Sequence, residues 1–386
     1  MASEPNSYPS PLLKSGVLDR EFKFEEATPI IGREYPTVNI VSDILDAPNA
    51  DDLIRDLAIT SVYPILQSTH PLTTPVSERG VVFFRAQHNL TDNLQKQLIH
   101  RLGQLTNKPH DSTLHIHPIL NNTSEFGVAD AEISTISSLQ RKKHFGHNPQ
   151  RQTGSKRYDA AQWHSDIQFE PVPADYTSLR LTQLPQTGGD TLWASGYEIY
   201  DRFSLAYRKF FEGLTATFVG DGFIKAAAAN PDKVKIYEQQ RGSPENKGKE
   251  LTAVHPVVRT NLVTGWKSIF ALGPFPKFIN ELNDKESAEL LQKFVDTIYE
   301  NHDLQVRFKW RNENDLAIWD NRSAFHTATN DYEGLGERFG NRAVGIGEKP
   351  YLDPTSRSRT EVLEERQQKI ENESKQKIDV SNTVSA

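Results

Sequence analysis

The chain has 386 residues, of which 36% are hydrophobic and 25% charged, and it carries a formal net charge of −7. This composition is typical of a globular protein, and it gives no sign of a nucleic-acid or membrane-surface partner. The absence of cysteine excludes disulfides, thiolate catalysis and cysteine-bound metals, so any metal must be bound by His, Asp or Glu. Because no signal segment or membrane-spanning run is found, we expect a cytoplasmic protein.

The two ends of the chain differ from its middle. Residues 1–34 begin with a polar, proline-rich stretch, and we expect them to form an N-terminal arm that extends over a core. Residues 354–386 are charged and nearly lack large apolar side chains, which is typical of a frayed helix followed by a disordered tail. No linker or internal repeat divides the rest, so residues 35–353 are predicted to form a single domain.

One segment near the N-terminus does not fit its surroundings. The sequence SVYPILQSTHPLTTPV at 61–76 separates a predicted helix from a predicted strand, and its prolines would break the helix. Our hypothesis is a translated unspliced intron or a late insertion, and the alternative is an ordinary surface loop. A transcript that encodes this segment, without a shorter spliced form, would contradict the intron hypothesis.

The remaining elements follow one another along the chain without a regular alternation. Helical patterns occur at 50–60, 90–106, 195–214 and 284–302. Strand patterns occur at 80–87, 177–185, 251–260, 266–272, 304–311, 315–321 and 342–348. This arrangement predicts a mainly β protein with helical decorations, built on a barrel or a jelly roll. A doubly wound α/β fold is disfavoured, because no glycine-rich phosphate loop joins a strand to a helix.

His164 and Asp166 are the first candidates for chemistry. In an extended chain, side chains two residues apart point to the same face. His-x-Asp is a weak signal alone, but His326 follows a predicted strand and could supply a third ligand. Two histidines and one carboxylate leave positions open on an octahedral ion and suit non-haem Fe(II) oxygen chemistry. A hydrolytic zinc site stays open at this point, because zinc accepts the same ligands.

Arg338 and Arg342 follow the candidate ligand His326 and are four residues apart. On a strand, this even spacing would place both side chains on one face. A guanidinium can bind a carboxylate or a sulfonate with two hydrogen bonds. An acidic co-substrate and an acidic substrate would each need one arginine, whereas the alternative is a pair of surface arginines.

The motifs WHSD, GGDTLW, WDNRSAFH and RAVGIGEKP together resemble the taurine dioxygenase type (TauD/TfdA) of Fe(II)/2-oxoglutarate-dependent dioxygenases. The resemblance covers about residues 35–350, is closest to fungal members, and implies a double-stranded β-helix, or jelly-roll, core in one dioxygenase domain. It also implies Fe(II) bound by His164, Asp166 and His326, with 2-oxoglutarate and O2 as co-substrates. The far carboxylate of 2-oxoglutarate would pair with Arg338 and accept a hydrogen bond from Thr191.

The same resemblance places Arg342 and His117 on the substrate side of the site, although His117 could instead be a buried histidine satisfied by the backbone. The taurine enzyme has a tyrosine at the position of Leu120 and an asparagine at that of Ala160. Losing two such polar contacts would cost about 1–3 kcal/mol each. We therefore expect a more apolar pocket than taurine requires, and the side chains expected to line it are those of Leu120, Ile167 and Phe169.

The sequence thus predicts an oxygenase that acts on a small anionic organic substrate, a sulfonate by family default. The closest alternative is a secondary-metabolism oxygenase that hydroxylates, desaturates or cyclises an amino acid or another carboxylate. More remote alternatives are a metal-dependent hydrolase and a non-enzymatic jelly-roll protein. No nucleic-acid or membrane partner is expected, and a homo-oligomer is compatible with the sequence.

Overall fold

The structure, a computed structural model, describes residues 8–13, 15–59, 76–121, 127–140, 162–232 and 234–384. The segment 61–76 lies outside the described residues except at Val76, so the intron hypothesis stays a prediction. Ala160 lies outside them as well. None of the helices in the described residues combines the length and the apolar character that a bilayer span requires.

The largest sheet has seven strands in the spatial order β1-β2-β3-β13-β5-β15-β4. Neighbouring strands run antiparallel, except β2 and β3, which are parallel. The bounds are β1 Glu25–Glu26, β2 Arg33–Tyr35, β3 Val81–Phe84, β4 Ile133–Ser137, β5 Ala174–Gln183, β13 Asp315–Asp320 and β15 Phe339–Ile346. Strands β3 and β13 are buried at every residue, so this part of the sheet is covered on both faces.

A smaller antiparallel sheet has the order β12-β6-β14 and packs on the large one. Its strands are β6 Thr191–Ser195, β12 Gln305–Phe308 and β14 Ala324–Ala328. Side chains from both sheets share one apolar cluster, in which the ring of Phe83 stacks on that of Phe308 at 4.2 Å and meets that of Trp193 at 5.4 Å. The two sheets therefore form two layers with a core between them.

Two further small sheets complete the β structure. One has the order β11-β7-β8 and the other pairs β9 with β10. The bounds are β7 Thr215–Val219, β8 Thr252–Pro256, β9 Val258–Thr260, β10 Lys267–Ile269 and β11 Pro276–Ile279. The stretch 251–260, predicted as one strand, is thus divided at Val257, whose N–H donates to the carbonyl of Leu214 instead of continuing one ladder.

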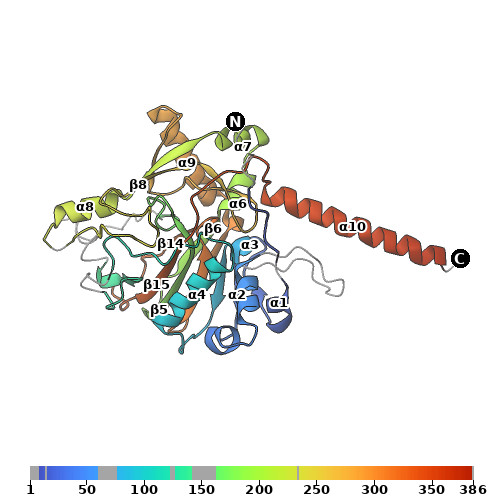
Figure 1. Cartoon of the computed structure of the whole chain (residues 1–386), viewed down its shortest axis with the longest axis horizontal. Helices are drawn as coiled ribbons and strands as arrows, with labels where there is room; N and C mark the ends of the chain where they lie inside the picture. Colours follow the sequence, from blue (N-terminus) through green and yellow to red (C-terminus); the bar gives the residue numbers. More distant parts are fainter. Residues whose placement is uncertain are drawn as a thin grey trace.

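Helices pack on the large sheet and on the two further small sheets. Near the N-terminus they are α1 Val17–Glu21, η1 Ile40–Leu45, α2 Ala50–Ala58, α3 Val76–Arg79 and α4 Asp92–Gln104, and α4 packs on β5 and β15 (Figure 1). Later helices are α6 Gly196–Asp201, α7 Leu205–Glu212, α8 Asp221–Ala229, α9 Asp284–Glu300 and η2 His302–Leu304.

The helix predicted over 195–214 is wrong in one respect, because the structure divides it into α6 and α7. Ser204 has the extended backbone of a residue preceding a helix (φ −60°, ψ 156°), so a new helix starts after it. The ring of Phe203 packs on those of Phe211 and Phe294 at 5.0 and 5.9 Å. This tertiary packing outweighs the helical periodicity of the stretch.

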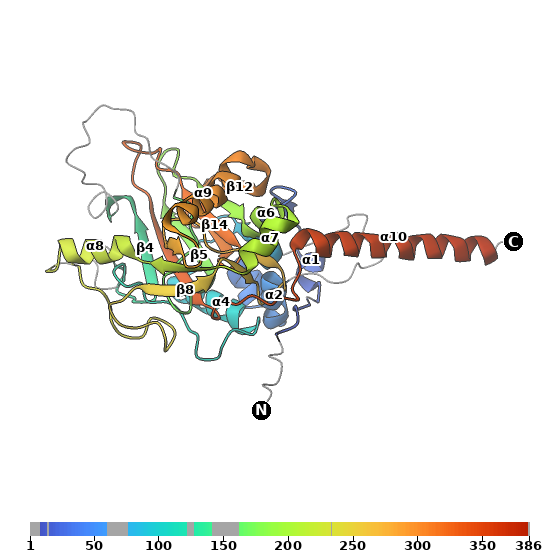
Figure 2. The ribbon, with the colours of Figure 1, turned by 90° about the horizontal axis from the view of Figure 1, so that it is seen from above.

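The C-terminal segment forms one helix, α10 Arg359–Val384, which extends away from the body of the molecule (Figures 1 and 2). The sequence predicted a frayed helix that ends in disorder. Near its start the helix is tied to the body by ion pairs of Arg359 with Glu198 at 2.6 Å and of Arg366 with Glu78 at 3.1 Å. Its many Glu, Lys and Gln residues are good helix formers, which accounts for its helical form.

Candidate metal and co-substrate site

His164 and His326 face one another across an isolated antiparallel bridge. The N–H of His164 donates to the carbonyl of His326 at 3.0 Å, and the N–H of His326 donates back at 2.8 Å. Residues directly opposite in such a bridge present their side chains on one face, and the two imidazole centroids are 4.2 Å apart. Strand β14, paired with β6, thus positions His326 against residues 162–170. This stretch contains His164 and Asp166 and is the ligand segment of the site.

Asp166 completes a cluster in which ligand atoms of the three side chains lie within 4.8 Å of one another. Nδ1 of His164 is 2.8 Å from the carbonyl oxygen of Gln162. Because a carbonyl only accepts, Nδ1 must carry the proton, and Nε2 of the neutral ring keeps a lone pair for a metal. The predicted triad is therefore assembled, with at least one histidine held in the tautomer that a metal needs.

The charge states of the triad also suit a divalent ion. Burial, reinforced by His164, lowers the pKa of His326 to about 3. Burial acts to raise the pKa of Asp166, but the Arg342 guanidinium and the two histidines lower it below its usual value. In the described residues, Oδ2 of Asp166 and Nδ1 of His326 are buried without a hydrogen-bond partner. Two neutral imidazoles and one carboxylate, with side-chain atoms that lack hydrogen-bond partners, fit Fe(II) as the bound ion.

Asn321 holds the backbone of Asp166, the carboxylate of the candidate triad, in place. Its side-chain oxygen accepts the backbone N–H of Asp166 at 3.0 Å and the indole N–H of Trp319 at 3.1 Å. Its side-chain nitrogen donates to the hydroxyl of Thr177 at 2.8 Å and to the carbonyl of Asp175 at 3.1 Å. All hydrogen-bonding groups of this buried amide are therefore used to join β13, β5 and the ligand segment.

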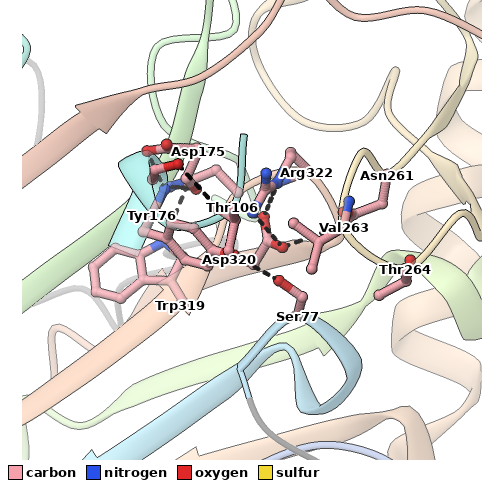
Figure 3. A network of polar contacts seen from close by, with 12 residues as sticks. Ser77, Thr106, Asp175, Tyr176, Asn261, Val263, Thr264, Trp319, Asp320 and Arg322 are labelled. Carbon is pink, nitrogen blue, oxygen red and sulfur yellow. Dashed lines mark hydrogen bonds and ion pairs between the residues drawn. The ribbon is translucent and has the colours of Figure 1, made fainter. Parts of the chain in front are cut away.

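The turn that contains Asn321 is itself fixed by a buried polar network (Figure 3). Arg322 donates to both carboxylate oxygens of Asp320, at 2.7 and 3.0 Å, and Asn261 donates to the same carboxylate at 3.0 Å. The Arg322 guanidinium also lies 4.6 Å from the centre of the Tyr176 ring. A bidentate pair in a buried site is geometrically specific, so the network holds the β13–β14 turn in one arrangement.

Replacing Asn321 with alanine is expected to weaken Fe(II) binding about 10- to 100-fold, the range for residues that orient metal ligands. The Asp166 N–H would lose its acceptor, and the ligand segment would lose its link to β5. Anaerobic Fe(II) titration measures the effect. Asn280→Ala is the control, because the Asn280 side chain hydrogen-bonds to Thr215 and Thr217 of β7 and contacts neither the turn nor the ligand segment in the described structure. Equal Fe(II) affinity in wild type and Asn321→Ala would contradict this role.

His255 fixes the same ligand segment from β8. Its Nε2–H lies 3.0 Å from the carbonyl oxygens of both Gln168 and Glu170. Burial, together with Arg259, lowers the pKa of His255 to about 4. The neutral imidazole is therefore the form that the fold accommodates.

The free energy of unfolding is expected to fall as the pH drops from about 6.5 to about 4, because only the unfolded state binds a proton at His255 in that window. The contribution of this one residue would be on the order of 3 kcal/mol. His255→Gln keeps a donor but cannot titrate, so its unfolding free energy should depend less on pH over that range. Chemical denaturation at several pH values tests this, and identical pH slopes would refute it.

Arg338 lies just before β15 and is buried next to Thr191, as the proposed co-substrate role requires. Its Nε donates to the carbonyl of Gly189 at 2.9 Å and its Nη2 lies 3.2 Å from Oγ1 of Thr191. Burial lowers the pKa of Arg338 to about 10, so the group is still charged at neutral pH. Among the described residues no carboxylate forms an ion pair with it. A buried cation that has no negatively charged partner is costly, and a bound anion would reduce that cost.

Arg342 reaches a different part of the site from Arg338. Its Nη1 lies 2.6 Å from Oδ1 of Asp166, so it contacts the triad directly. The register of β15 against β5 shifts between Phe339 and Gly340, which interrupts the even spacing on which the expectation of one shared face was based. Both guanidinium groups nevertheless face the site, one beside Thr191 and the other beside Asp166 of the candidate triad.

His117 is buried, and its Nδ1 accepts the backbone N–H groups of Ile119 at 3.2 Å and Leu120 at 3.0 Å. The backbone thus satisfies Nδ1 of the ring, as expected for a buried histidine. The proton of the neutral ring must therefore be on Nε2. Burial first, and then Arg342, lower the pKa of His117 well below its usual value. The neutral ring can therefore still offer one N–H donor to a ligand.

Ile167 and Phe169 belong to one apolar cluster beside the triad, whereas Leu120 is not part of it. Ile167 has φ +48°, an uncommon conformation for a β-branched residue and one often found at functional sites. Two aromatic residues that the sequence did not indicate join this cluster. Phe275 lies with its ring 6.2 Å from that of His164, and Phe223 of α8 lies 4.8 Å from the ring of His117.

His115 is a further buried residue near the site that the sequence did not indicate, and it contacts Glu170. Nε2 of His115 is 3.2 Å from Oε1 of Glu170, and Arg241 binds both oxygens of that carboxylate at 2.5 and 2.9 Å. The ring of His115 lies 6.0 Å from that of His117. The His115–Glu170–Arg241 network thus packs behind His117 and the ligand segment. In the sequence, no local pattern distinguishes these residues from a pair on the surface.

Known proteins share both the sequence pattern and the fold. The family model described as taurine catabolism dioxygenase TauD, TfdA family matches residues 56–344. The alpha-ketoglutarate-dependent dioxygenase oryG of Aspergillus oryzae is 45% identical over 94% of this chain and 98% of its own. An alpha-ketoglutarate-dependent sulfonate dioxygenase of Saccharomyces cerevisiae is 29% identical over 72% of this chain and 60% of its own. A taurine dioxygenase structure from Burkholderia xenovorans superimposes with a TM-score of 0.57 over 87% of this chain and 93% of its own, at 22% identity.

The chain therefore belongs to the TauD/TfdA family of dioxygenases, and its described part has the fold of that family. It is an Fe(II)- and 2-oxoglutarate-dependent dioxygenase, with Fe(II) as cofactor and 2-oxoglutarate and O2 as co-substrates. The prediction of the family, enzyme class and cofactors is confirmed.

Proposed function

We propose that this dioxygenase oxidises a small organic anion with an apolar body. Fe(II) would be bound by His164, Asp166 and His326, and the far carboxylate of 2-oxoglutarate by Thr191 and Arg338. The observation that carries the assignment is the buried and charged Arg338, which lies beside Thr191 and forms no ion pair within the described residues. Thr191 itself lies on the sheet that also contains His326. When bound, Fe(II) with 2-oxoglutarate and O2 supplies the oxidising chemistry.

Arg342 and His117 are assigned to the substrate anion. The guanidinium already lies on a carboxylate oxygen of Asp166, so it is positioned to hold a second anion close to the metal. The neutral His117 ring offers Nε2–H as a donor. If Asp166 also held Fe(II), its attraction for Arg342 would weaken, and the guanidinium would be more available to the substrate.

The body of the substrate is proposed to contact apolar side chains. Ile167, Phe169, Phe223 and Phe275 form one cluster next to His164, with ring centroids of Phe169 5.4 and 5.2 Å from those of Phe223 and Phe275. An alkyl or aryl group is favoured by such a wall, whereas a small zwitterion such as taurine would leave its ammonium unpaired. Leu120 stays a predicted contact.

The anion can be a sulfonate or a carboxylate, since a guanidinium binds both. A sulfonate substrate is supported by the yeast relative, which is an alpha-ketoglutarate-dependent sulfonate dioxygenase. An amino acid or other carboxylate, with hydroxylation, desaturation or oxidative cyclisation, is the second candidate and is supported by the apolar cluster. Metal-dependent hydrolysis would have no use for Arg338 and Thr191.

Succinate formation from 2-oxoglutarate, measured with a matched panel of alkyl and aryl sulfonates and carboxylates, tests this proposal. We expect turnover to increase with the apolar character of the anion and to be low with taurine. Neutral analogues of an active compound are the control and should be poor substrates. Preferential turnover of taurine, or of the neutral analogues, would contradict the proposed substrate class.

We also propose the type of core, the division of the chain into segments, and the location of the protein. The two facing sheets support a double-stranded β-helix core. A single dioxygenase domain over 35–353, an arm at 1–34 and a charged tail at 354–386 are our division of the chain. Cytoplasmic location and the absence of nucleic-acid and membrane partners are predictions from composition and charge, and a homo-oligomer is compatible with them.

A further inference from the structure

The hydroxyl of Thr191 receives two hydrogen bonds in the described structure. Nε1 of Trp310 lies 3.1 Å and Nη2 of Arg338 lies 3.2 Å from Oγ1 of Thr191. An indole N–H and a guanidinium N–H can only donate, so Oγ1 must accept both hydrogen bonds. With both of its lone pairs used, the hydroxyl can take part in one more interaction only as a donor.

The hydrogen of Thr191 has no acceptor among the described residues, although the side chain is almost fully buried. The neighbouring guanidinium cannot accept it, and the nearby carbonyl of Gly189 accepts Nε of Arg338 at 2.9 Å but no hydrogen bond from the Thr191 hydroxyl. The complementary ligand atom is therefore an acceptor, and beside Arg338 it should carry negative charge. A carboxylate oxygen satisfies both conditions, whereas a methyl group satisfies neither.

Trp310 is held firmly enough to impose this orientation. It follows β12, its side chain is buried, and its ring packs edge-on against that of Phe308 at 4.9 Å. Phe308 in turn stacks on Phe83 of the large sheet. The indole thus lies in the core between the two sheets, with its one polar atom directed at Thr191.

We propose that Trp310 is a positioning residue that fixes the Thr191 hydroxyl as a donor, and that it thereby makes the site selective for 2-oxo acids ending in a second carboxylate. The inference rests on the proposed function, in which Thr191 and Arg338 bind 2-oxoglutarate. It adds a residue that is distant in sequence from both. Without the indole donor, the hydroxyl can rotate and use its hydrogen elsewhere, so part of its contribution to carboxylate binding is lost.

The test compares the binding of two co-substrates by anaerobic calorimetry on the Fe(II)-loaded full chain. One is 2-oxoglutarate, and the other is 2-oxopentanoate, which has the same chain length but a methyl group in place of the far carboxylate. Trp310→Phe should weaken 2-oxoglutarate binding about three- to tenfold, the range for one neutral hydrogen bond, and leave 2-oxopentanoate binding unchanged. The effect should vanish when Trp310→Phe is made in the Thr191→Val background.

Trp193→Phe is the matched control, because Trp193 lies in the same cluster but its buried indole N–H has no hydrogen-bond partner in the described part of the chain. It should change neither affinity. Trp310→Met, which also lacks the donor, replaces Trp310→Phe if that variant does not fold. Unchanged 2-oxoglutarate affinity in the Trp310 variant, or an equal loss for both ligands, would overturn the inference alone. A wild-type protein that binds no 2-oxoglutarate would overturn the proposed function as well, which separates the two failures.

Discussion

Replacing Asp166 with alanine is expected to abolish measurable turnover and to weaken Fe(II) binding by more than about 100-fold, beyond the range for residues outside the ligand set. Asp166 is the carboxylate of a three-residue cluster whose ligand atoms lie within 4.8 Å of one another. Its removal would leave two neutral imidazoles and the Arg342 guanidinium, which would repel a cation. Anaerobic Fe(II) titration and succinate formation measure the two effects.

His164→Ala should behave like Asp166→Ala, because it removes the Nε2 ligand atom that the Gln162 carbonyl keeps unprotonated. Asp303→Ala is the control, since Asp303 is exposed and paired only with Arg202 in the described ion pairs. Full activity and Fe(II) affinity in either ligand variant would show that the triad is not the metal site. Loss of folding is checked by circular dichroism and thermal unfolding of each variant without metal.

Arg338→Ala is expected to raise the 2-oxoglutarate concentration needed for half-maximal turnover by roughly 10- to 150-fold. This corresponds to about 1.5–3 kcal/mol for a hydrogen bond to a charged group. The alanine would also leave Oγ1 of Thr191 without one of its two donors. Kinetic titration of 2-oxoglutarate at a fixed concentration of the primary substrate measures the change.

Arg342→Ala is the comparison for Arg338→Ala, because it removes an arginine four residues away in the same segment. It should impair the primary substrate and change the 2-oxoglutarate response little. If Arg342→Ala altered only the response to 2-oxoglutarate, the roles of the two arginines would be reversed. Arg342 also contacts Asp166, so its Fe(II) affinity has to be measured separately from its kinetics.

The candidate triad could be predicted because two of its residues are close in sequence and the third lies in one of the motifs that resemble the family. The two-residue spacing of His164 and Asp166 in an extended segment and the place of His326 beside a strand are visible in the sequence. The residues that orient and surround the ligands could not be predicted in the same way. Asn321 and Trp310 act through contacts with residues 155 and 119 positions away, and no local pattern encodes such distances.

The apolar wall shows the same limit. Ile167 and Phe169 follow the first ligands, so their place near the site could be expected, but Phe223 and Phe275 reach it from α8 and from the loop before β11. The arginine pair was expected on one face of a regular strand, and a register shift in β15 intervened. Helix α6 ends early for a comparable reason, because the aromatic packing of Phe203 competes with helical periodicity.

The central claim, that His164, Asp166 and His326 hold Fe(II) next to a 2-oxoglutarate site, is tested most directly by anaerobic absorption spectroscopy. Fe(II) and 2-oxoglutarate are added to the purified full chain, and the weak visible metal-to-ligand charge-transfer band is sought. We expect a band that is lost in Asp166→Ala and shifts when a bound substrate anion changes the surroundings of the metal. Bound metal without any band would contradict the assignment and favour a hydrolytic metal site.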